Sequence, residues 1–297
     1  MAYLLRYFDP VKGACLGCLS DGKVFDITPK FGSMAAWLQA SIGQVGAAIQ
    51  ELESFISGET LAYSFGDLDR VPRPGLAYLL APVDKQEVWA AGVTYTRSRV
   101  ARQQEAQDGG DIYGRVYAAE RPELFFKSLG EKVVGHRQAV GIRADARWSV
   151  PEPELVLVLN PALEVVGMTI GNDMSSRDIE GANPLYLPQA KVYTASCALG
   201  PAIALQPLAE WPRVSIRLQI HRMGEEIFSG QTDTSMIQRR LDELVAYLGR
   251  SASFSYGAVL LTGTGIVPPE TFTLQEGDWI TITIEQIGEL INIVKVV

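Results

Sequence analysis

The alternation of apolar and polar positions near the start of the chain predicts a small antiparallel meander. Three short alternating runs, at 3–8, 14–20 and 23–27, are separated by Asp-Pro and Asp-Gly turn signals. Residues 33–57 follow with the composition of one or two helices, and Ser33 is a suitable N-cap for the first of them.

A change in amino-acid composition divides the chain into two parts. Three prolines at 71–86 predict a boundary between a small N-terminal α+β domain, 1–80, and a main domain, 81–297. The apolar run at 88–95 predicts a buried strand that ends at a glycine-containing turn. The glycine-rich stretch 108–122 predicts an irregular segment.

The C-terminal part of the chain continues the β-rich pattern. Residues 215–231 predict a hairpin that turns near Met223-Gly224, and the alternation at 278–297 predicts further strands. Residues 234–248 carry apolar side chains at helical spacing, which predicts one amphipathic helix. Together these patterns predict a β-rich α+β fold.

Two glutamates stand directly before the apolar run LVLVL at 155–159, which predicts a buried strand. Side chains two apart in a strand point to the same face, about 6.5 Å apart at Cα, so Glu152 and Glu154 are expected to point to one place. Asp173 lies near the end of the next apolar run. If the two runs pair, three carboxylates converge.

Three converging carboxylates are typical ligands of a hard divalent cation, Mg²⁺ first, with Mn²⁺ or Ca²⁺ as alternatives. A simpler interpretation of Glu-x-Glu is a solvated strand end. The apolar run that follows favours the metal site, because buried carboxylates need partners.

The composition excludes several classes of partner. The net charge is −8 without a basic stripe, so neither nucleic acid nor an anionic membrane is expected to bind. No apolar run approaches the roughly 20 residues of a membrane span. Arg6 stands where a signal peptide would have its apolar centre, which indicates a cytoplasmic protein. The cysteines at 15, 18 and 197 are expected to be buried thiols rather than disulfides or zinc ligands.

Two further residues are candidates for proton transfer. Glu123 precedes two phenylalanines, and apolar surroundings would suit a general acid or base. The alternative is a strand-end glutamate paired with Arg121 or Lys127. Lys191 lies in a nearly uncharged stretch and could act as a base or hold a developing negative charge. Its alternative is a surface lysine whose stem lies on apolar neighbours.

The remaining candidates would bind an acidic substrate. The loop TGTGIVP at 262–268 could hold a carboxylate with its backbone N–H groups and Thr264, although a plain turn fits as well. Arginine at 97 and 99, just after Tyr95, suits a carboxylate clamp, and a solvated helix face is the alternative. With only two histidines, no serine or cysteine hydrolase triad is evident.

The ordered motifs Glu-x-Glu, GMTIGNDMSSRD, KVYTASCALGP and TGTGIVP resemble those of the fumarylacetoacetate hydrolase superfamily, from about Val88 to the C-terminus. The resemblance implies a mixed β-roll, often with a small N-terminal domain, and a homo-oligomer such as a dimer or tetramer. It also implies Mg²⁺ at Glu152, Glu154 and Asp173, with 2-oxo or diketo acids as substrates.

Two departures argue against the hydrolases of this superfamily. Ser98 occupies the place of a histidine that C–C hydrolases usually carry, and Thr194 that of an aspartate after the lysine. The stretches RPELFFK, SVPEPELVLVL and NPLYLPQAKVY instead resemble the 2-keto-3-deoxy-D-arabinonate dehydratase branch. That resemblance implies catalysis by Glu123 and Lys191. Thr264, Tyr95 and Arg99 are the expected substrate-binding residues.

The resulting hypothesis is dehydration of a 2-keto-3-deoxy sugar acid to 2,5-dioxopentanoate through a metal-stabilised enolate. Lys191 is expected to act as base and Glu123 as acid, and the two roles could be exchanged. One alternative is hydrolysis or decarboxylation of diketo acids, acylpyruvates or oxaloacetate at the same metal site. The other is a metal-binding structural protein that has lost catalytic activity.

Overall fold

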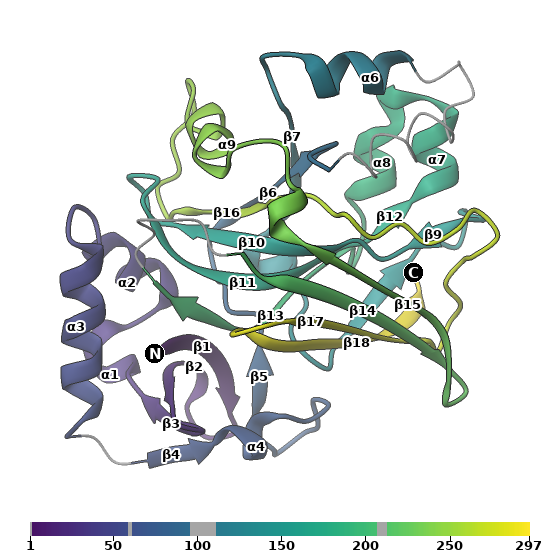
Figure 1. Ribbon diagram of the computed structural model, residues 1–297. Helices are drawn as coiled ribbons and strands as arrows, with labels where there is room; N and C mark the ends of the chain where they lie inside the picture. Colours follow the sequence, from purple (N-terminus) through teal and green to yellow (C-terminus); the bar gives the residue numbers. More distant parts are fainter. Residues whose placement is uncertain (1, 59–60, 96–110, 207–212) are drawn as a thin grey trace.

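The computed structural model describes residues 2–58, 61–95, 111–206 and 213–297, and its strands form two main sheets in this part of the chain (Figure 1). The first is an eleven-stranded sheet of order β4-β3-β2-β1-β13-β11-β10-β16-β6-β7, with β5 paired to β1. Its strands are β1 (Tyr3–Asp9), β2 (Gly13–Ser20), β3 (Lys23–Asp26), β4 (Leu61–Ser64), β5 (Tyr78–Leu80), β6 (Glu87–Gly92), β7 (Glu123–Leu129), β10 (Pro153–Leu159), β11 (Val165–Asp173), β13 (Cys197–Leu205) and β16 (Ala258–Leu261).

The second sheet packs against β10 and β11 and has the order β15-β14-β17-β18-β8 (Figure 1). Its strands are β8 (Ala139–Ile142), β14 (Ser215–Arg222), β15 (Glu225–Asp233), β17 (Trp279–Ile284) and β18 (Gly288–Val296). A short pair joins β9 (Ser149–Val150) to β12 (Ser175–Ser176). The predicted β-rich α+β fold is therefore confirmed.

Helices are short and lie around the sheets. The α-helices are α1 (Thr28–Phe31), α2 (Met34–Ala40), α3 (Val45–Ile56), α4 (Phe65–Leu68), α6 (Asp111–Ala118), α7 (Arg177–Ala182), α8 (Leu187–Lys191) and α9 (Leu241–Leu248). Single 3₁₀ turns occupy η1 (Gly130–Lys132), η2 (Pro184–Tyr186) and η3 (Thr234–Met236). None of the helices in the described part of the chain has the length and apolarity needed to cross a bilayer.

The sequence of strand β10 is continuously apolar because both faces of the strand are buried. Leu155, Leu157 and Leu159 pack into the core shared with the second sheet. Val156 and Val158 point to the other face and enter two further apolar clusters. Both faces of the strand are buried, so no polar alternation remains, as expected for a central strand.

The N-terminal meander is confirmed, and it joins the main sheet. Strand β1 pairs with β2 and β5, and its first residues also pair with β13. Helices α2 and α3 cover one face of these strands, and the Ser33 side chain accepts a hydrogen bond from Ala36 N as the predicted N-cap. The boundary at residue 80 stays a prediction.

The three cysteines are free and buried, as predicted. Cys15 and Cys18 lie on the same strand but enter different apolar clusters, one on each face of the sheet. Side chains three residues apart along a strand point to opposite faces of the sheet. The pair therefore cannot converge on a single metal ion.

The predicted hairpin is confirmed in β14 and β15, and its turn residues Met223 and Gly224 both have positive φ, 53° and 88°. The helix predicted at 234–248 is wrong in its first half, because α9 begins only at Leu241. The preceding segment leaves the helical path: Ile237 forms a bridge to Tyr95, and Gln238 N donates to Thr94 O at 2.9 Å.

The irregular segment predicted at 108–122 is wrong for residues 111–118, which form helix α6, while the described residues 119–122 are irregular. Arg239, distant in sequence, donates to the carbonyls of Val116, Ala119 and Glu120 at the end of this helix. Carbonyl groups at a helix C-terminus lack partners within the helix, so a guanidinium at this place stabilises it. The sequence pattern does not reveal such a partner.

Candidate active site

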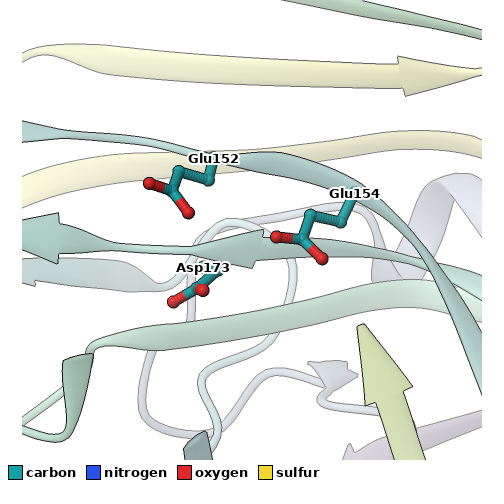
Figure 2. A group of neighbouring side chains, drawn as sticks. All are labelled: Glu152, Glu154 and Asp173. Atoms are coloured by element: carbon teal, nitrogen blue, oxygen red, sulfur yellow. The ribbon is translucent and has the colours of Figure 1, made fainter. Parts of the chain in front are cut away.

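The three predicted metal ligands converge at the ends of two paired strands (Figure 2). Antiparallel pairing of β10 with β11 sets Glu154 opposite Gly171, and Asp173 N donates to Glu152 O at 3.0 Å. One oxygen of each carboxylate lies within 4.8 Å of the others. All three side chains are buried. This burial excludes the alternative of a solvated strand end.

Cationic side chains neutralise two of the three carboxylates. Lys191 Nζ lies 2.6 Å from Glu152 Oε2 and 2.9 Å from Asp173 Oδ2. Arg177 Nη2 lies 2.9 Å from Glu152 Oε1, and Lys127 Nζ lies 2.5 Å from Asp173 Oδ1. Lys191 is 1% exposed, so it is not the surface lysine of the alternative interpretation.

Glu154 is different, because no cationic side chain forms an ion pair with it among the described residues. Its Oε2 accepts a hydrogen bond from Gly263 N at 2.5 Å. Burial, followed by the negative charges of Asp173 and Glu152, raises the pKa of Glu154 well above its usual range. A nearby cation would stabilise the charged form of a buried carboxylate that has no cationic partner. The three ligands therefore fit a divalent cation with oxygen ligands.

Glu123, the first residue of β7, lines the same pocket as the three carboxylates. It pairs with Gly92 across β6 and β7, and a Cβ added at residue 92 would overlap the Glu123 carboxylate. The glycine therefore makes the space that this carboxylate occupies. Arg121 and Lys127 form no ion pair with Glu123, and the Lys127 ammonium contacts Asp173 instead.

The predicted substrate-binding residues have different positions. Thr264 lines the carboxylate pocket, and its Oγ1 accepts a hydrogen bond from Ile266 N at 3.2 Å. Tyr95 is buried in the wall of a neighbouring cavity, beside Gly265. The arginines at 97 and 99, together with Ser98, lie outside the described residues.

Sequence reasoning missed three charged residues of this site. Lys127 lies in an apolar run four residues after Glu123, and its burial could have been suspected from that run. Arg177 and Glu180 follow Asp173 at the start of α7, and both line the pocket. Glu180 Oε2 accepts a hydrogen bond from Ser175 Oγ at 3.1 Å. Only the short strand β12 separates α7 from the end of β11, so α7 begins beside the site.

The fold and the acidic site define the class of protein. Residues 87–295 match the family described as "Fumarylacetoacetate (FAA) hydrolase C-terminal". The chain belongs to this fumarylacetoacetate hydrolase family, as its motifs predict.

Two curated relatives within this family are dehydratases by name. The "Probable 2-keto-3-deoxyxylonate dehydratase" of Haloferax volcanii is 50% identical over 217 residues, 73% of this chain and 74% of that protein. The "2-dehydro-3-deoxy-D-arabinonate dehydratase" of Saccharolobus solfataricus is 42% identical over 218 residues, 72% of this chain and 73% of that protein.

A solved structure agrees with these relatives over the whole chain. It is described as "2-keto-3-deoxy-D-arabinonate dehydratase complexed with magnesium and 2,5-dioxopentanoate". Its TM-score is 0.84 at 31% identity, and the match covers 100% of this chain and 99% of that chain. The similarity therefore extends through the N-terminal meander as well as the matched family region.

Glu154→Gln is expected to weaken Mg²⁺ binding by roughly 100-fold or more, because an amide replaces an anionic ligand. In EDTA the variant is expected to be more stable than the wild type, with a melting temperature about 2 °C higher or more at pH 8. Calorimetric titration with Mg²⁺ and thermal melts in EDTA measure both effects. The exposed residue Glu276 provides the control, Glu276→Gln, for which neither quantity is expected to change.

The sign of the pH dependence follows from the raised pKa of Glu154 in the folded protein. Folded protein holds this proton more tightly than unfolded protein, so wild-type stability without metal falls as the pH rises above the usual glutamate range. Below that range the carboxyl is protonated in both states. The stability advantage of Glu154→Gln should therefore grow from pH 5 to pH 8, and an advantage that shrinks would contradict the assignment.

Proposed function

We propose that this protein is a hydro-lyase that removes water from a 2-keto-3-deoxy sugar acid of the 2-keto-3-deoxy-D-arabinonate type and forms 2,5-dioxopentanoate. One observation carries the proposal: Glu123 and Lys191 line the same pocket as the three carboxylates. An acid, a base and a cation site are therefore available together, as elimination next to a carbonyl group requires. The dehydratase names of the relatives support the same reaction.

Glu152, Glu154 and Asp173 are the residues that would hold Mg²⁺, with Mn²⁺ or Ca²⁺ as other hard cations that suit oxygen ligands. The metal would supply Lewis-acid polarisation of the substrate's 2-keto group. The similar solved structure contains magnesium by its description. Lys127 and Arg177 remain as counter-charges to Asp173 and Glu152.

Lys191 is the proposed base for the proton on C3. Its Nζ lies at the pocket, between Glu152 and Asp173, and the Phe125 ring centroid is 5.6 Å away. To accept the C3 proton, Lys191 must first release its own proton, and lysine is a residue whose pKa shifts readily when it is buried. When Lys191 takes the C3 proton, the electron pair of the C–H bond forms a double bond between C2 and C3, and the π pair of the 2-keto group moves onto its oxygen.

Glu123 is the proposed acid. Its carboxyl group donates a proton to the hydroxyl group on C4, and the C4–O bond breaks with release of water. The electron pair of the C2–C3 double bond then forms the bond C3=C4, and the 2-keto group is restored. The double bond between C3 and C4 then isomerises with the C5 hydroxyl group to give the C5 aldehyde. The reverse assignment, with Glu123 as base and Lys191 as acid, yields the same product.

The substrate carboxylate must be bound by several hydrogen-bond donors. Thr264 and its loop are proposed to supply it, because they line the pocket directly beside Glu154. Tyr95 and Arg99 stay predictions as substrate-binding residues. The homo-oligomeric state and the cytoplasmic location also stay predictions of the sequence.

The test is turnover of 2-keto-3-deoxy-D-arabinonate with Mg²⁺ and with EDTA, read as formation of the aldehyde product. Metal-dependent formation of 2,5-dioxopentanoate without cleavage of a C–C bond is the expected result. Acylpyruvates and oxaloacetate are assayed in parallel. Turnover of one of these, with no dehydration of the sugar acid, would overturn the proposed function and leave the metal site intact. Mg²⁺ binding without turnover of any of these acids would favour a structural protein.

A further inference from the structure

We propose that Lys127 is a positioning residue of this site, which holds Asp173 and the main chain of Lys191 in the arrangement needed for cation binding and proton removal. The inference rests on the proposed function for the proton-removal part only. The cation-binding part can be measured without any substrate.

The backbone places Lys127 in an exceptional position on β7. In the pairing of β6 with β7, Val88 lies opposite Ser128 and the next residue, Trp89, lies opposite Phe126. Lys127 is therefore the extra residue of a β-bulge. A bulge changes the direction of the side chain that it carries and is frequent beside active sites. Here it directs a lysine into the interior, where the side chain is 0% exposed.

The Lys127 ammonium group donates two hydrogen bonds and forms one ion pair. Its Nζ lies 2.5 Å from Asp173 Oδ1, 2.9 Å from Met174 O and 2.6 Å from Lys191 O. The acceptors belong to the end of β11, the residue after it, and the last residue of α8. One side chain thus connects three segments that meet at the pocket.

Each contact fixes a part of the proposed machinery. Lys127 forms an ion pair with Asp173 Oδ1 and Lys191 forms one with Oδ2, so each oxygen of this carboxylate lies beside an ammonium group. The carbonyl of Lys191 lies at the end of α8, where helix carbonyls lack partners, and Lys127 supplies the missing donor. Asp173 and the backbone from which the Lys191 side chain extends are therefore held by the same group.

The folding stability that the buried Lys127–Asp173 ion pair provides does not by itself explain why the pair is there. A buried ion pair is often no more stabilising than apolar side chains of similar volume, because removing both charges from water is costly. A group that orients a metal ligand has a different consequence: its loss lowers metal affinity or activity by about 10- to 100-fold. Metal affinity therefore separates a positioning role from a structural one.

The test compares Lys127→Met with wild type and with Arg222→Met. Arg222 forms an ion pair with the buried Asp278, so its loss provides a control for the removal of a cation from a buried carboxylate. Calorimetric titration with Mg²⁺ is expected to show a Kd about 10- to 100-fold higher for Lys127→Met. For Arg222→Met the melting temperature is expected to fall while the Kd stays within about threefold of the wild type.

Lys127→Arg is the second variant, and it keeps the charge beside Asp173. A planar guanidinium presents its N–H bonds in different directions from an ammonium group, so it cannot reproduce all three contacts at once. Its Mg²⁺ affinity is expected to stay within about threefold of wild type, because the Asp173 pair survives, while kcat falls about tenfold or more. This variant carries the test if Lys127→Met does not fold, and wild-type kcat together with a wild-type Kd would then overturn the proposal.

An unchanged or lower Kd in folded Lys127→Met would overturn the proposal, because it would show that the ammonium merely reduces the negative charge. A wild-type protein that binds no Mg²⁺ would overturn it as well. A wild-type protein that binds Mg²⁺ but does not dehydrate the sugar acid would defeat the proposed function alone, since the Kd comparison remains valid. The two failures are thus distinguishable.

Discussion

Lys191→Met is expected to lower kcat for the sugar acid by about 10³-fold or more, within the range that general acid–base groups contribute. Methionine is of similar length and cannot accept a proton. The variant also releases Glu152 Oε2 and Asp173 Oδ2 from their ammonium partner. Mg²⁺ affinity is therefore expected to stay at the wild-type level or rise. A retained affinity would show that turnover is not lost because the metal is lost.

Exchange of the C3 proton with solvent identifies the step that Lys191 performs. In D₂O, wild-type enzyme is expected to introduce deuterium at C3, and Lys191→Met is expected to lose this exchange together with turnover. The exposed Lys132 gives the control Lys132→Met, which should retain both. Turnover within tenfold of wild type in Lys191→Met would rule out the proposed base.

Glu123→Gln is expected to lower kcat by about 10²- to 10⁴-fold, because an amide cannot supply the proton that the departing C4 hydroxyl group needs. Glutamine has nearly the same shape, so it should fit in the space that Gly92 leaves for the Glu123 carboxylate. Exchange at C3 should persist in this variant, since proton removal comes before the loss of water. Mg²⁺ affinity should also be retained.

The exposed residue Glu131 supplies the matched control, Glu131→Gln, with activity expected to be that of wild type. The two active-site variants together decide the direction of proton transfer. If Glu123→Gln loses C3 exchange while Lys191→Met keeps it, the base and acid are reversed from the assignment made here. If both variants keep turnover, neither residue is catalytic.

Sequence patterns predicted the convergence of the three carboxylates, for a local reason. The two-residue period of a strand places Glu152 and Glu154 on one face whatever the rest of the fold does. Their convergence with Asp173 depended on the pairing of two apolar runs, and β10 and β11 are indeed neighbours. A hairpin-like connection between consecutive strands is the commonest arrangement, so this pairing was a reasonable expectation.

The groups that balance the charge of these ligands were not predicted. Lys127 reaches Asp173 because of a bulge on a strand far away in the sequence, and a bulge leaves no period to detect. Arg177 belongs to a motif that was quoted for the family resemblance, yet its contact with Glu152 needs the turn between β11 and α7. Long charged side chains can reach several neighbours, so their partners are decided in three dimensions.

The errors in secondary structure have the same origin. The segment before Leu241 has the apolar spacing of a helix but pairs with Thr94 and Tyr95 instead, since backbone hydrogen bonds to a neighbouring segment outweigh weak helical propensity. Helix α6 forms where glycines favoured an irregular chain, and Arg239 satisfies its terminal carbonyls. In both places a distant partner overrides the local preference.

By itself, the sequence determined the β-rich class, the buried strand β10 and the convergence of Glu152, Glu154 and Asp173, because strand period and apolar runs act over a few residues. Only the tertiary structure decided that Glu123, Lys191 and these ligands share one pocket, that Glu154 alone among the three lacks a cationic partner in the described chain, and that Lys127 joins three segments around it. Those facts depend on contacts between segments far apart in sequence, and such contacts are fixed when the sheets pack.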